Sequence, residues 1–385
     1  MRVLVVNAGS SSLKLALLDG DDATLREREL DAPGARVDPQ QLRQALDDGL
    51  GEADAVGHRI VHGGERFRER VRVDAAVRDA LEQLVDLAPL HQPKSLAALD
   101  AVTRALPQTP AVACFDTAFH ATLPAPAYTY ALPAQWRERW GLRRYGFHGL
   151  SHAWVAHRTP ELLQRPQEGL RIVSCHLGAG ASLCAIADGR SLDTTMGFTP
   201  LEGLVMATRS GSVDPGLLLW LLGHEEIDAR ELADALEHRS GLLGLAGSAD
   251  MREIVERARA DDGSVGDNPV DVAQRAQLAL DTYVHRLRAG IAAMVAALGG
   301  LDALVFTGGV GERSAQVRAR AAAGLGFLGV ALDGARNAAA RGDSEIGLEG
   351  TPVRALVVSA REDVEIARQV RTLLSASKDR RGRSG

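Results

Sequence analysis

Imidazole and guanidinium side chains gather in one part of the sequence, and several stand next to glycines. Eight of the eleven histidines fall between His58 and His176, in segments such as HRIVHGG and YGFHGLSH. Active sites are commonly found at the ends of strands and helices, where we expect these segments to lie. Metal binding is a weaker alternative, because the two histidines of HGLSH have i, i+4 spacing but no HExxH motif accompanies them.

Four glycine-rich segments follow apolar runs and are candidates for phosphate binding. They read NAGSSS, HLGAGAS, GLAGSAD and FTGGVGERS, and we interpret each as a turn after a strand. Glycine lets the backbone approach a phosphate, and successive free N–H groups form an anion site. Each segment alone is weak support, because most glycine-rich turns bind nothing. None matches a Walker loop or fits a dinucleotide fingerprint well.

Length and composition restrict the class of protein. A chain of 385 residues exceeds the usual size of one hydrophobic core, so we expect two domains with a cleft between them. The formal net charge of −6 indicates neither a nucleic-acid nor a membrane partner. The opening apolar run is too short for a signal peptide, and the three cysteines, in apolar segments, are typical of reduced thiols. We therefore predict a cytoplasmic protein that binds a small molecule.

Apolar periodicity predicts an alternating α/β order and a largely covered mixed sheet. The expected strands cover residues 2–7, 12–20, 53–64, 110–116, 302–312 and 352–359. The expected helices cover 75–88, 95–106, 147–163, 214–222, 229–238, 270–297, a segment from 314, and 362–374. The stretch 21–54 is polar and less periodic, and it yields no clear element.

The opening pattern returns in the second half of the chain. RVLVVNAGSSSLKLALLDG, residues 2–20, aligns with RIVSCHLGAGASLCAIADG, residues 171–189, at one constant shift. Both copies read as strand, glycine turn, strand and Asp-Gly turn. This shared order predicts two halves built on one plan.

Nine segments resemble the motifs of one family, both in their residues and in their order along the chain. They are VNAGSSSLK, GHRIVHGGE, LAPLHQPKS, FDTAFHATLP, RRYGFHGLSH, CHLGAGAS, TTMGFTPLEGLVMATRSGSVDP, FTGGVGERS and EDVEIAR. Together they resemble acetate kinases, the short-chain carboxylate kinases of the sugar kinase, heat-shock chaperone and actin superfamily. The resemblance runs from residue 2 to about residue 374. It implies a duplicated actin-like (ribonuclease H-like) α/β fold with two domains, residues 1–116 joined by a returning helix 363–376, and residues 117–362. Residues 377–385 are basic and polar, and we expect them to form a disordered tail.

The resemblance also assigns roles to individual residues. Asn7 and Glu362 would hold Mg²⁺ or Mn²⁺, and Arg59 would bind the substrate carboxylate. The implied catalytic residues are Asp116, His148, Arg209 and His91, and the implied acyl pocket comprises Val61, Leu90, Phe147 and Pro200. The implied contacts to ATP or ADP are Ser10, Ser12, Lys14, His176, Leu177, Gly178, Ala179, Gly180, Asp250, Met251, Arg252, Gly309, Val310, Gly311, Glu312 and Arg313.

The activity that the resemblance implies is reversible phosphorylation of acetate by ATP, through direct in-line transfer with Mg²⁺, in a homodimer. A carboxylate acceptor is already ionised at pH 7, so no general base is needed, and we interpret Asp116 as orienting cations and metal-bound water. A kinase that prefers propionate or butyrate is the first alternative, because one methylene is worth only about 1–3 kcal/mol of discrimination. A non-metabolic actin-like ATPase is the second, although it would not need Arg59, Phe147 or Pro200.

Several positions depart from the pattern of the family. Ala179 stands where the family usually has the Asn of HLGNG, and Gln92 stands where it has the Asn of LHNPP. The TNEE of the family reads Ala360, Arg361, Glu362 and Asp363 here, and the region 20–54 is shorter than usual. The implied catalytic set is intact. Rate, nucleotide preference and acyl selectivity are the properties that these departures could alter.

Overall fold

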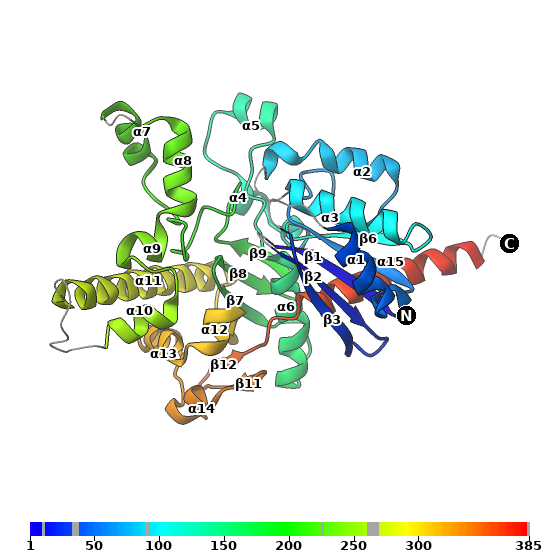
Figure 1. The fold of residues 1–385 in the computed structure, drawn as a ribbon. Coiled ribbons are helices and arrows are strands. Elements are labelled where there is room, and N and C mark those ends of the chain that lie inside the picture. Colours follow the sequence, from blue (N-terminus) through cyan, green and yellow to red (C-terminus); the bar gives the residue numbers. More distant parts are fainter. Residues whose placement is uncertain (10–11, 33–37, 89–91, 225–226, 260–268, 383–385) are drawn as a thin grey trace. The chain divides into compact units, whose positions relative to one another are not determined.

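The computed structural model describes residues 1–9, 12–32, 38–88, 92–224, 227–259 and 269–382, with only the backbone for 269–271 and 377–382. The chain divides into two compact units (Figure 1). Unit 1 comprises Met1–Ala121, Phe147–Trp154 and Arg361–Gly385, and unit 2 comprises Thr122–Gly146 and Val155–Ala360. The division differs from the predicted domains chiefly because residues 147–154 belong to unit 1.

A six-stranded mixed sheet forms the centre of unit 1, in the order β3-β2-β1-β4-β6-β5. β1, β4 and β6 are parallel neighbours, whereas β2, β3 and β5 run antiparallel to theirs. Leu42 of α1 and Val102 of α3 pack on one face, and Ile366 of α15 packs on the other, against Gly57. The bounds are β1 Val3–Ala8, β2 Ser12–Leu18, β3 Thr24–Asp31, α1 Pro39–Asp47, β4 Ala55–Ile60, β5 Val71–Arg72, α2 Ala75–Glu82, α3 Gln92–Ala105, β6 Ala111–Phe115 and α15 Glu362–Gly382.

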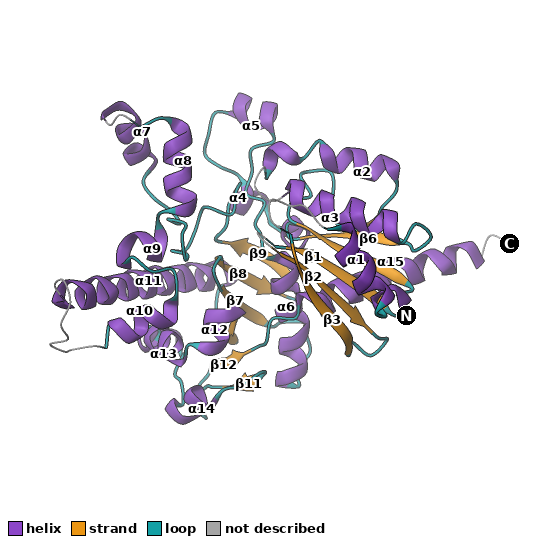
Figure 2. Ribbon diagram, viewed as in Figure 1, coloured by secondary structure: helices purple, strands orange, loops and turns teal. Residues whose placement is uncertain are grey.

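Unit 2 has a second six-stranded sheet, in the order β11-β12-β10-β7-β8-β9, with helices around it (Figure 2). The long helix α11 packs on β7, β8 and β9, where a Cβ at Gly290 would lie 2.7 Å from the Leu183 side chain. The strands are β7 Arg171–Leu177, β8 Ala181–Ala187, β9 Arg190–Thr194, β10 Ala303–Thr307, β11 Ser344–Glu345 and β12 Arg354–Val357. The helices are α4 Ala125–Tyr128, α5 Ala134–Trp140, α6 Gly149–Leu163 (which begins in unit 1), α7 Pro215–His224, α8 Ala229–His238, α9 Gly241–Ala246, α10 Met251–Arg257, α11 Pro269–Leu298, α12 Gly308–Arg313, α13 Ala315–Ala323 and α14 Gly334–Ala339.

The two sheets have the same topology, which confirms the predicted duplication. In both, an antiparallel three-stranded meander joins two parallel strands, and a short antiparallel strand closes the far edge. The bounds of β8 repeat those of β2 at the shift of 169 residues that aligns the sequences. The cross-strand register differs by one residue, because Asn7 pairs with Lys14 whereas His176 pairs with Ser182.

Several local predictions were wrong for identifiable reasons. The stretch 21–54 contains β3 and α1, and β3 was missed because this edge strand, TLRERELD, is exposed on both faces and has no apolar alternation. FTGGVGERS does not form a turn but passes from β10 directly into the short helix α12. GLAGSAD follows no strand: it begins within helix α9 and ends at Asp250, the N-cap of α10. Residues 377–382, expected to be disordered, continue α15, since no proline or glycine interrupts them before Gly382.

Two further findings concern the predicted environment of the protein. Cys114, Cys175 and Cys184 are buried and lie outside any disulfide, and burial raises the pKa of each thiol. Among the described residues, every helix is too short or too polar to cross a membrane.

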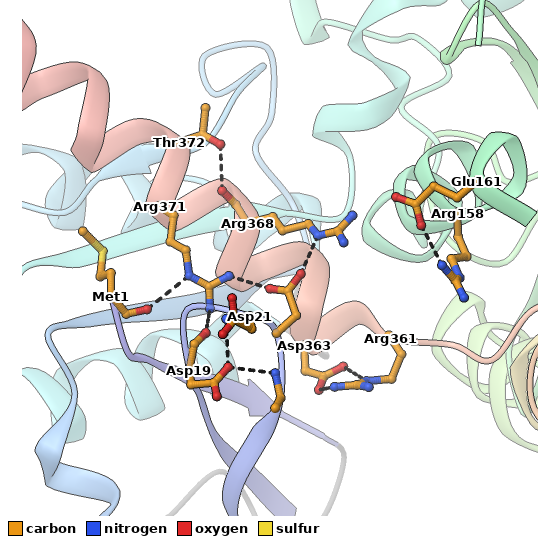
Figure 3. Close-up of polar contacts among 12 residues, drawn as sticks. Met1, Asp19, Asp21, Arg158, Glu161, Arg361, Asp363, Arg368, Arg371 and Thr372 are labelled. Carbon is orange, nitrogen blue, oxygen red and sulfur yellow. Dashed lines mark hydrogen bonds and ion pairs between the residues drawn. The ribbon is translucent and has the colours of Figure 1, made fainter. Parts of the chain in front are cut away.

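Two arginines of helix α15 contact the turn between β2 and β3 and fix the helix to the rest of unit 1 (Figure 3). Arg368 Nε lies 2.8 Å from Asp22 Oδ2, and Arg371 Nη1 lies 2.5 Å from Asp22 Oδ1. Arg371 also donates to the backbone oxygens of Met1 and Asp19. Burial raises the pKa of Asp22, but the hydrogen bonds and charges of the two arginines outweigh burial, and the net shift is downward.

Replacing Asp22 by asparagine is expected to lower the free energy of unfolding by about 1–2 kcal/mol at pH 7, because two charge-assisted contacts are weakened at a partly exposed site. Since the pKa of Asp22 is lowered in the folded state, its contribution is complete above about pH 4 and disappears as the pH falls through the folded pKa. Urea denaturation from pH 7 to pH 3 should show the difference between variant and wild type shrinking. Asp21→Asn, at the adjacent exposed position, is the control, and an equal loss in both variants would contradict this account.

Candidate active site

Four side chains meet at the carboxyl ends of the parallel strands of unit 1, the edge where α/β sheets commonly bind ligands. Arg59 on β4 donates from Nε and Nη2 to the carboxylate of Asp116, which follows β6, at 3.0 and 2.6 Å. The Nη1 of Arg59 donates to Asn7 Oδ1 on β1 at 3.1 Å and lies 3.8 Å from Glu362 Oε2 at the start of α15. Three sheet strands and one helix therefore place these residues around a single guanidinium.

The electrostatics of this cluster keep the guanidinium charged. The Asp116 side chain is only 2% exposed, whereas 21% of Arg59 remains exposed and accessible to a ligand. Burial lowers the pKa of Arg59, but the negative charges of Asp116 and Glu362 outweigh burial and raise it above the ordinary value. Arg59 is thus a fixed cation at a partly open site, as a binder of a carboxylate or phosphate requires.

His148 lies beside this cluster in a backbone conformation that few non-glycine residues adopt. Its φ is 55°, in the left-handed region. On one side, His120 Nε2 donates to the Phe147 carbonyl at 3.0 Å, and on the other the Gly149 N–H donates to the Asp116 carbonyl at 2.8 Å. These two contacts fix the backbone on both sides of His148. Strain of this kind is commonly retained at functional sites.

Gly149→Ala is expected to reduce turnover by at least about tenfold, because a Cβ at Gly149 would lie 2.1 Å from the Asp116 carbonyl oxygen and would displace His148. If His148 has the catalytic role predicted from the sequence, a displacement of about 1 Å is enough for a loss of this order or larger. Steady-state kinetics should be measured together with thermal unfolding. Gly334→Ala is the control, because nothing lies within 4 Å of that Cβ. Wild-type turnover in Gly149→Ala would show that the backbone conformation of His148 does not depend on this glycine.

Apolar and amide side chains build the neighbouring part of unit 1. Val61 and Phe147 are buried, and the rings of His62 and Phe147 meet edge to face at 5.5 Å. The pKa of His62 is lowered to about 4 by burial, so its imidazole is neutral at pH 7. The side chain of Gln92 exchanges two hydrogen bonds with the backbone of His62, at 3.3 and 3.2 Å. Gln92 therefore anchors the start of α3 to the end of β4.

The first hairpin presents Ser12 and Lys14 on β2. Lys14 is the cross-strand partner of Asn7, so both side chains project from the same face of the sheet. Ser12 Oγ donates to Glu29 Oε1 of β3 at 2.6 Å, and Lys14 Nζ lies 4.0 Å from the same oxygen. Glu29 was not predicted as a site residue, because the sequence of its strand, β3, shows no apolar alternation. The predicted site residues Ser10, Leu90 and His91 lie outside the described residues.

Unit 2 carries Arg209 in an irregular segment after β9. Arg209 Nη1 donates to the Pro200 carbonyl at 3.2 Å, so these two predicted residues are in contact. The Ala207 N–H donates to the carbonyl of Ala179 at 3.0 Å, which joins this segment to the turn between β7 and β8. The same turn is closed by a 2.9 Å bond from Gly178 N to Gly180 O. Within unit 2, the segment of Arg209 is thus tied directly to one of the predicted phosphate turns.

Helix α12 brings the second predicted nucleotide segment to the end of β10. Gly308 has φ 77°, and a Cβ there would lie 2.8 Å from the carbonyl oxygen of Leu177, so the backbone passes close to β7. Arg318 of α13, 1% exposed, donates to the carbonyls of Gly311 and Glu312 at 2.8 and 2.7 Å. The pKa of Arg318 is lowered to about 10, first by burial and then by Arg341. Sequence reasoning missed Arg318, although a buried arginine bonded to these carbonyls fixes the end of α12.

The three predicted nucleotide contacts at α10 differ in their exposure. Asp250 caps α10 by accepting from the Arg252 N–H at 2.8 Å, and its carboxylate pairs with the Arg252 guanidinium. The Arg252 hydrogen bonds lower the pKa of Asp250 to about 2. Met251 is 5% exposed and belongs to the core of unit 2. Asp250 and Arg252 are therefore open to a ligand, whereas the Met251 side chain is covered.

Comparison with known proteins defines the class to which this duplicated fold belongs. The profile of the Acetokinase family matches residues 35–368, so the chain belongs to that family. An acetate kinase of Gloeobacter violaceus is 44% identical over 410 aligned positions, with 96% of this chain and 98% of the relative covered. The crystal structure of Porphyromonas gingivalis acetate kinase superposes with a TM-score of 0.87 at 36% identity, covering 97% of this chain and 99% of the other. A propionate kinase from Francisella tularensis superposes with a TM-score of 0.86 at 32% identity, covering 96% and 98%.

Proposed function

We propose that this protein is an ATP-dependent acetate phosphotransferase that forms acetyl phosphate and ADP reversibly. Membership of the Acetokinase family supports this assignment, and the observation that carries it is the convergence of Asn7, Asp116 and Glu362 on Arg59. An acetate oxygen attacks the terminal phosphorus of ATP in line with the bond to ADP. The new bond joins that oxygen to phosphorus, the old bond to ADP breaks, and no proton needs to leave the acceptor.

The chemistry accounts for the residue types. Acetate is ionised at pH 7, because its pKa is well below 7, so positioning and charge stabilisation replace base catalysis. The loose transition state spreads negative charge over the equatorial phosphoryl oxygens, which cations stabilise. Arg59 binds the acetate carboxylate, and both carboxylate oxygens of Asp116 hold Arg59 in place. His148 and Arg209 stabilise the moving phosphoryl group, with His91 as a further member of this set.

The residues also fit a magnesium ion. Asn7 Oδ1 and Glu362 Oε2 lie 3.1 and 3.8 Å from Arg59 Nη1, so an amide oxygen and a carboxylate oxygen border the same part of the cluster. The described residues contain no group of three or more His, Cys, Asp or Glu side chains suited to a metal. Two protein oxygens suit Mg²⁺, which usually keeps several waters and binds substrate phosphates. When bound there, the ion would neutralise charge on the phosphates of ATP.

Each unit by itself carries proposed nucleotide contacts. Ser12 and Lys14 of unit 1 bind phosphate oxygens, with Ser10 beside them. In unit 2, the turn from His176 to Gly180, the helix from Gly309 to Arg313, and the exposed pair Asp250 and Arg252 bind ATP. The carbonyl of Ala179 is engaged by Ala207, and its methyl side chain adds no polar contact.

A preference for propionate is the second candidate, because the Francisella tularensis propionate kinase superposes nearly as well as the acetate kinase. The test is a panel of formate, acetate, propionate and butyrate under saturating ATP and Mg²⁺. We expect kcat/KM to be highest for acetate and about 10-fold lower for propionate, which corresponds to one methylene group. A higher kcat/KM for propionate would replace acetate as the substrate while leaving the reaction class unchanged.

We also propose that two copies of the chain form a homodimer through α7. This helix, PGLLLWLLGH, has no buried residue, and Leu219 and Trp220 are 72% and 50% exposed. An exposed apolar helix of this kind marks an interaction surface. Leu219→Glu is expected to convert the dimer to a monomer in size-exclusion chromatography with light scattering. Phe327→Glu, at a 77% exposed position outside α7, is the control, and a wild-type protein that is monomeric at micromolar concentration would refute the proposal.

The cellular setting follows from the same observations. Three buried cysteines outside any disulfide support a reducing compartment, for which the cytoplasm is our proposal. The partners in this proposal are ATP or ADP and a small carboxylate.

A further inference from the structure

Arg209 is held by a second element of unit 2 whose acidic side chain has no assigned role. Glu237 lies in the last turn of α8, and its Oε2 is 3.1 Å from Arg209 Nε. Both side chains are largely buried, with 21% of Arg209 and 19% of Glu237 exposed. We propose that Glu237 is a positioning residue, which orients the Arg209 guanidinium toward the phosphoryl group.

The backbone around this pair is fixed on both sides. Ser210 N–H donates to the Leu236 carbonyl at 3.1 Å, and Ser240 N–H donates to the Thr208 carbonyl at 2.9 Å. The Thr208 hydroxyl donates to the backbone carbonyl of Glu237 itself, also at 2.9 Å. The segment that carries Arg209 therefore runs along the end of α8, and the ion pair adds a side-chain contact to an already rigid frame.

The division of contacts around the guanidinium explains what Glu237 contributes. Arg209 Nη1 donates to the Pro200 carbonyl at 3.2 Å, and Nε faces Glu237, so two edges of the planar group are engaged by protein. A guanidinium has five N–H donors in a fixed plane, so fixing two edges determines where its remaining donors point. Nη1 also contacts Met206 Sδ at 3.8 Å, so Nη2 is the edge that can reach an anionic ligand.

The position of Glu237 on its helix indicates that the pair is not incidental. A carboxylate in the last turn of a helix is disfavoured by the helix dipole, which places negative charge at that end. Arg209 compensates for this placement. The other acidic side chains of α8, Glu231 and Asp234, pair with the exposed Arg239 instead. Glu237 alone among these three faces Arg209.

The test compares Glu237→Ala, Glu237→Gln and Asp234→Ala with wild type in the direction of ATP formation, where the product is detected sensitively. Glu237→Ala is expected to lower kcat about 10- to 30-fold with the KM for ADP changed less than about 2-fold, because the misoriented guanidinium affects the transition state rather than nucleotide binding. Glu237→Gln keeps the side-chain shape and an oxygen beside Arg209 Nε and should retain at least about one third of wild-type kcat. Asp234→Ala should match wild type. Wild-type or higher kcat in Glu237→Ala would overturn the proposal.

A double-variant cycle separates this proposal from the assigned role of Arg209, on which it rests. If Glu237 acts through Arg209, Glu237→Ala should lower kcat less than about 2-fold in an Arg209→Ala background. A full 10-fold loss in that background would overturn the positioning role and indicate a general structural defect. If Arg209→Ala alone kept wild-type turnover, the role of Arg209 itself would be refuted.

Discussion

Replacing Arg209 by alanine is expected to lower kcat by about 1,000-fold while ATP binding stays within about 3-fold of wild type. The reason is that a guanidinium aimed at a transferring phosphoryl group acts mainly on the transition state, and such arginines are worth about 10³–10⁵ in turnover. The loss should appear equally in kcat and kcat/KM. Stopped-flow or coupled assays give the rate, and calorimetric titration with ATP gives the affinity.

The control for this variant is Arg239→Ala. Arg239 is an exposed arginine directly after α8 that pairs with Asp234 of that helix. Its loss should leave the kinetics unchanged. An Arg209→Ala protein that folds but no longer binds ATP would place Arg209 in nucleotide binding instead of in catalysis.

Asp116→Asn is expected to lower kcat at least about 100-fold and to destabilise unit 1 by about 2 kcal/mol. Asp116 is 2% exposed and accepts three hydrogen bonds from Arg59 at 3.0, 3.2 and 2.6 Å. An amide has one acceptor oxygen, and its NH₂ group would face the guanidinium, so Arg59 would lose its orientation. Kinetics with acetate as the varied substrate should show a raised KM as well as the lower kcat.

A matched pair in the same unit supplies the control. Asp100 accepts from Arg78 at 2.7 and 2.8 Å, so Asp100→Asn disturbs a similar arginine–carboxylate contact away from the Arg59 cluster. It should lower stability by at most about 1 kcal/mol and leave kcat unchanged. Wild-type kinetics in Asp116→Asn would remove Asp116 from the catalytic account.

The parts of the fold that could be predicted are those in which apolar residues recur with one clear period. β1, β2, β7 and β8 are buried strands, so their periodicity and glycine turns also indicated the duplication. β3 could not be predicted, because every side chain of the strand except that of Leu30 is exposed, and its pairing with β2 leaves no apolar pattern in the sequence. The helix α12 was taken as a turn because its glycines mask the helical pattern, and close approach to β7 rather than flexibility explains Gly308.

The residues of the candidate site also differ in whether the sequence alone reveals them. Residues within distinctive motifs, such as Arg59 and His148, could be singled out from the sequence. Glu237 and Arg318 act through residues distant from them in the chain, and nothing in their own segments marks them. The link from His120 to Phe147 likewise depends on a tertiary hydrogen bond, which a single sequence does not reveal.

The most direct test of the proposed activity is the formation of acetyl phosphate by the purified protein. With ATP, Mg²⁺ and millimolar acetate, we expect a hydroxylamine-trappable acyl phosphate to accumulate in equal amount with ADP, and omission of acetate or Mg²⁺ to abolish it. ADP formation that is independent of acetate, with no trapped acyl phosphate, would contradict the account and would indicate an ATPase instead.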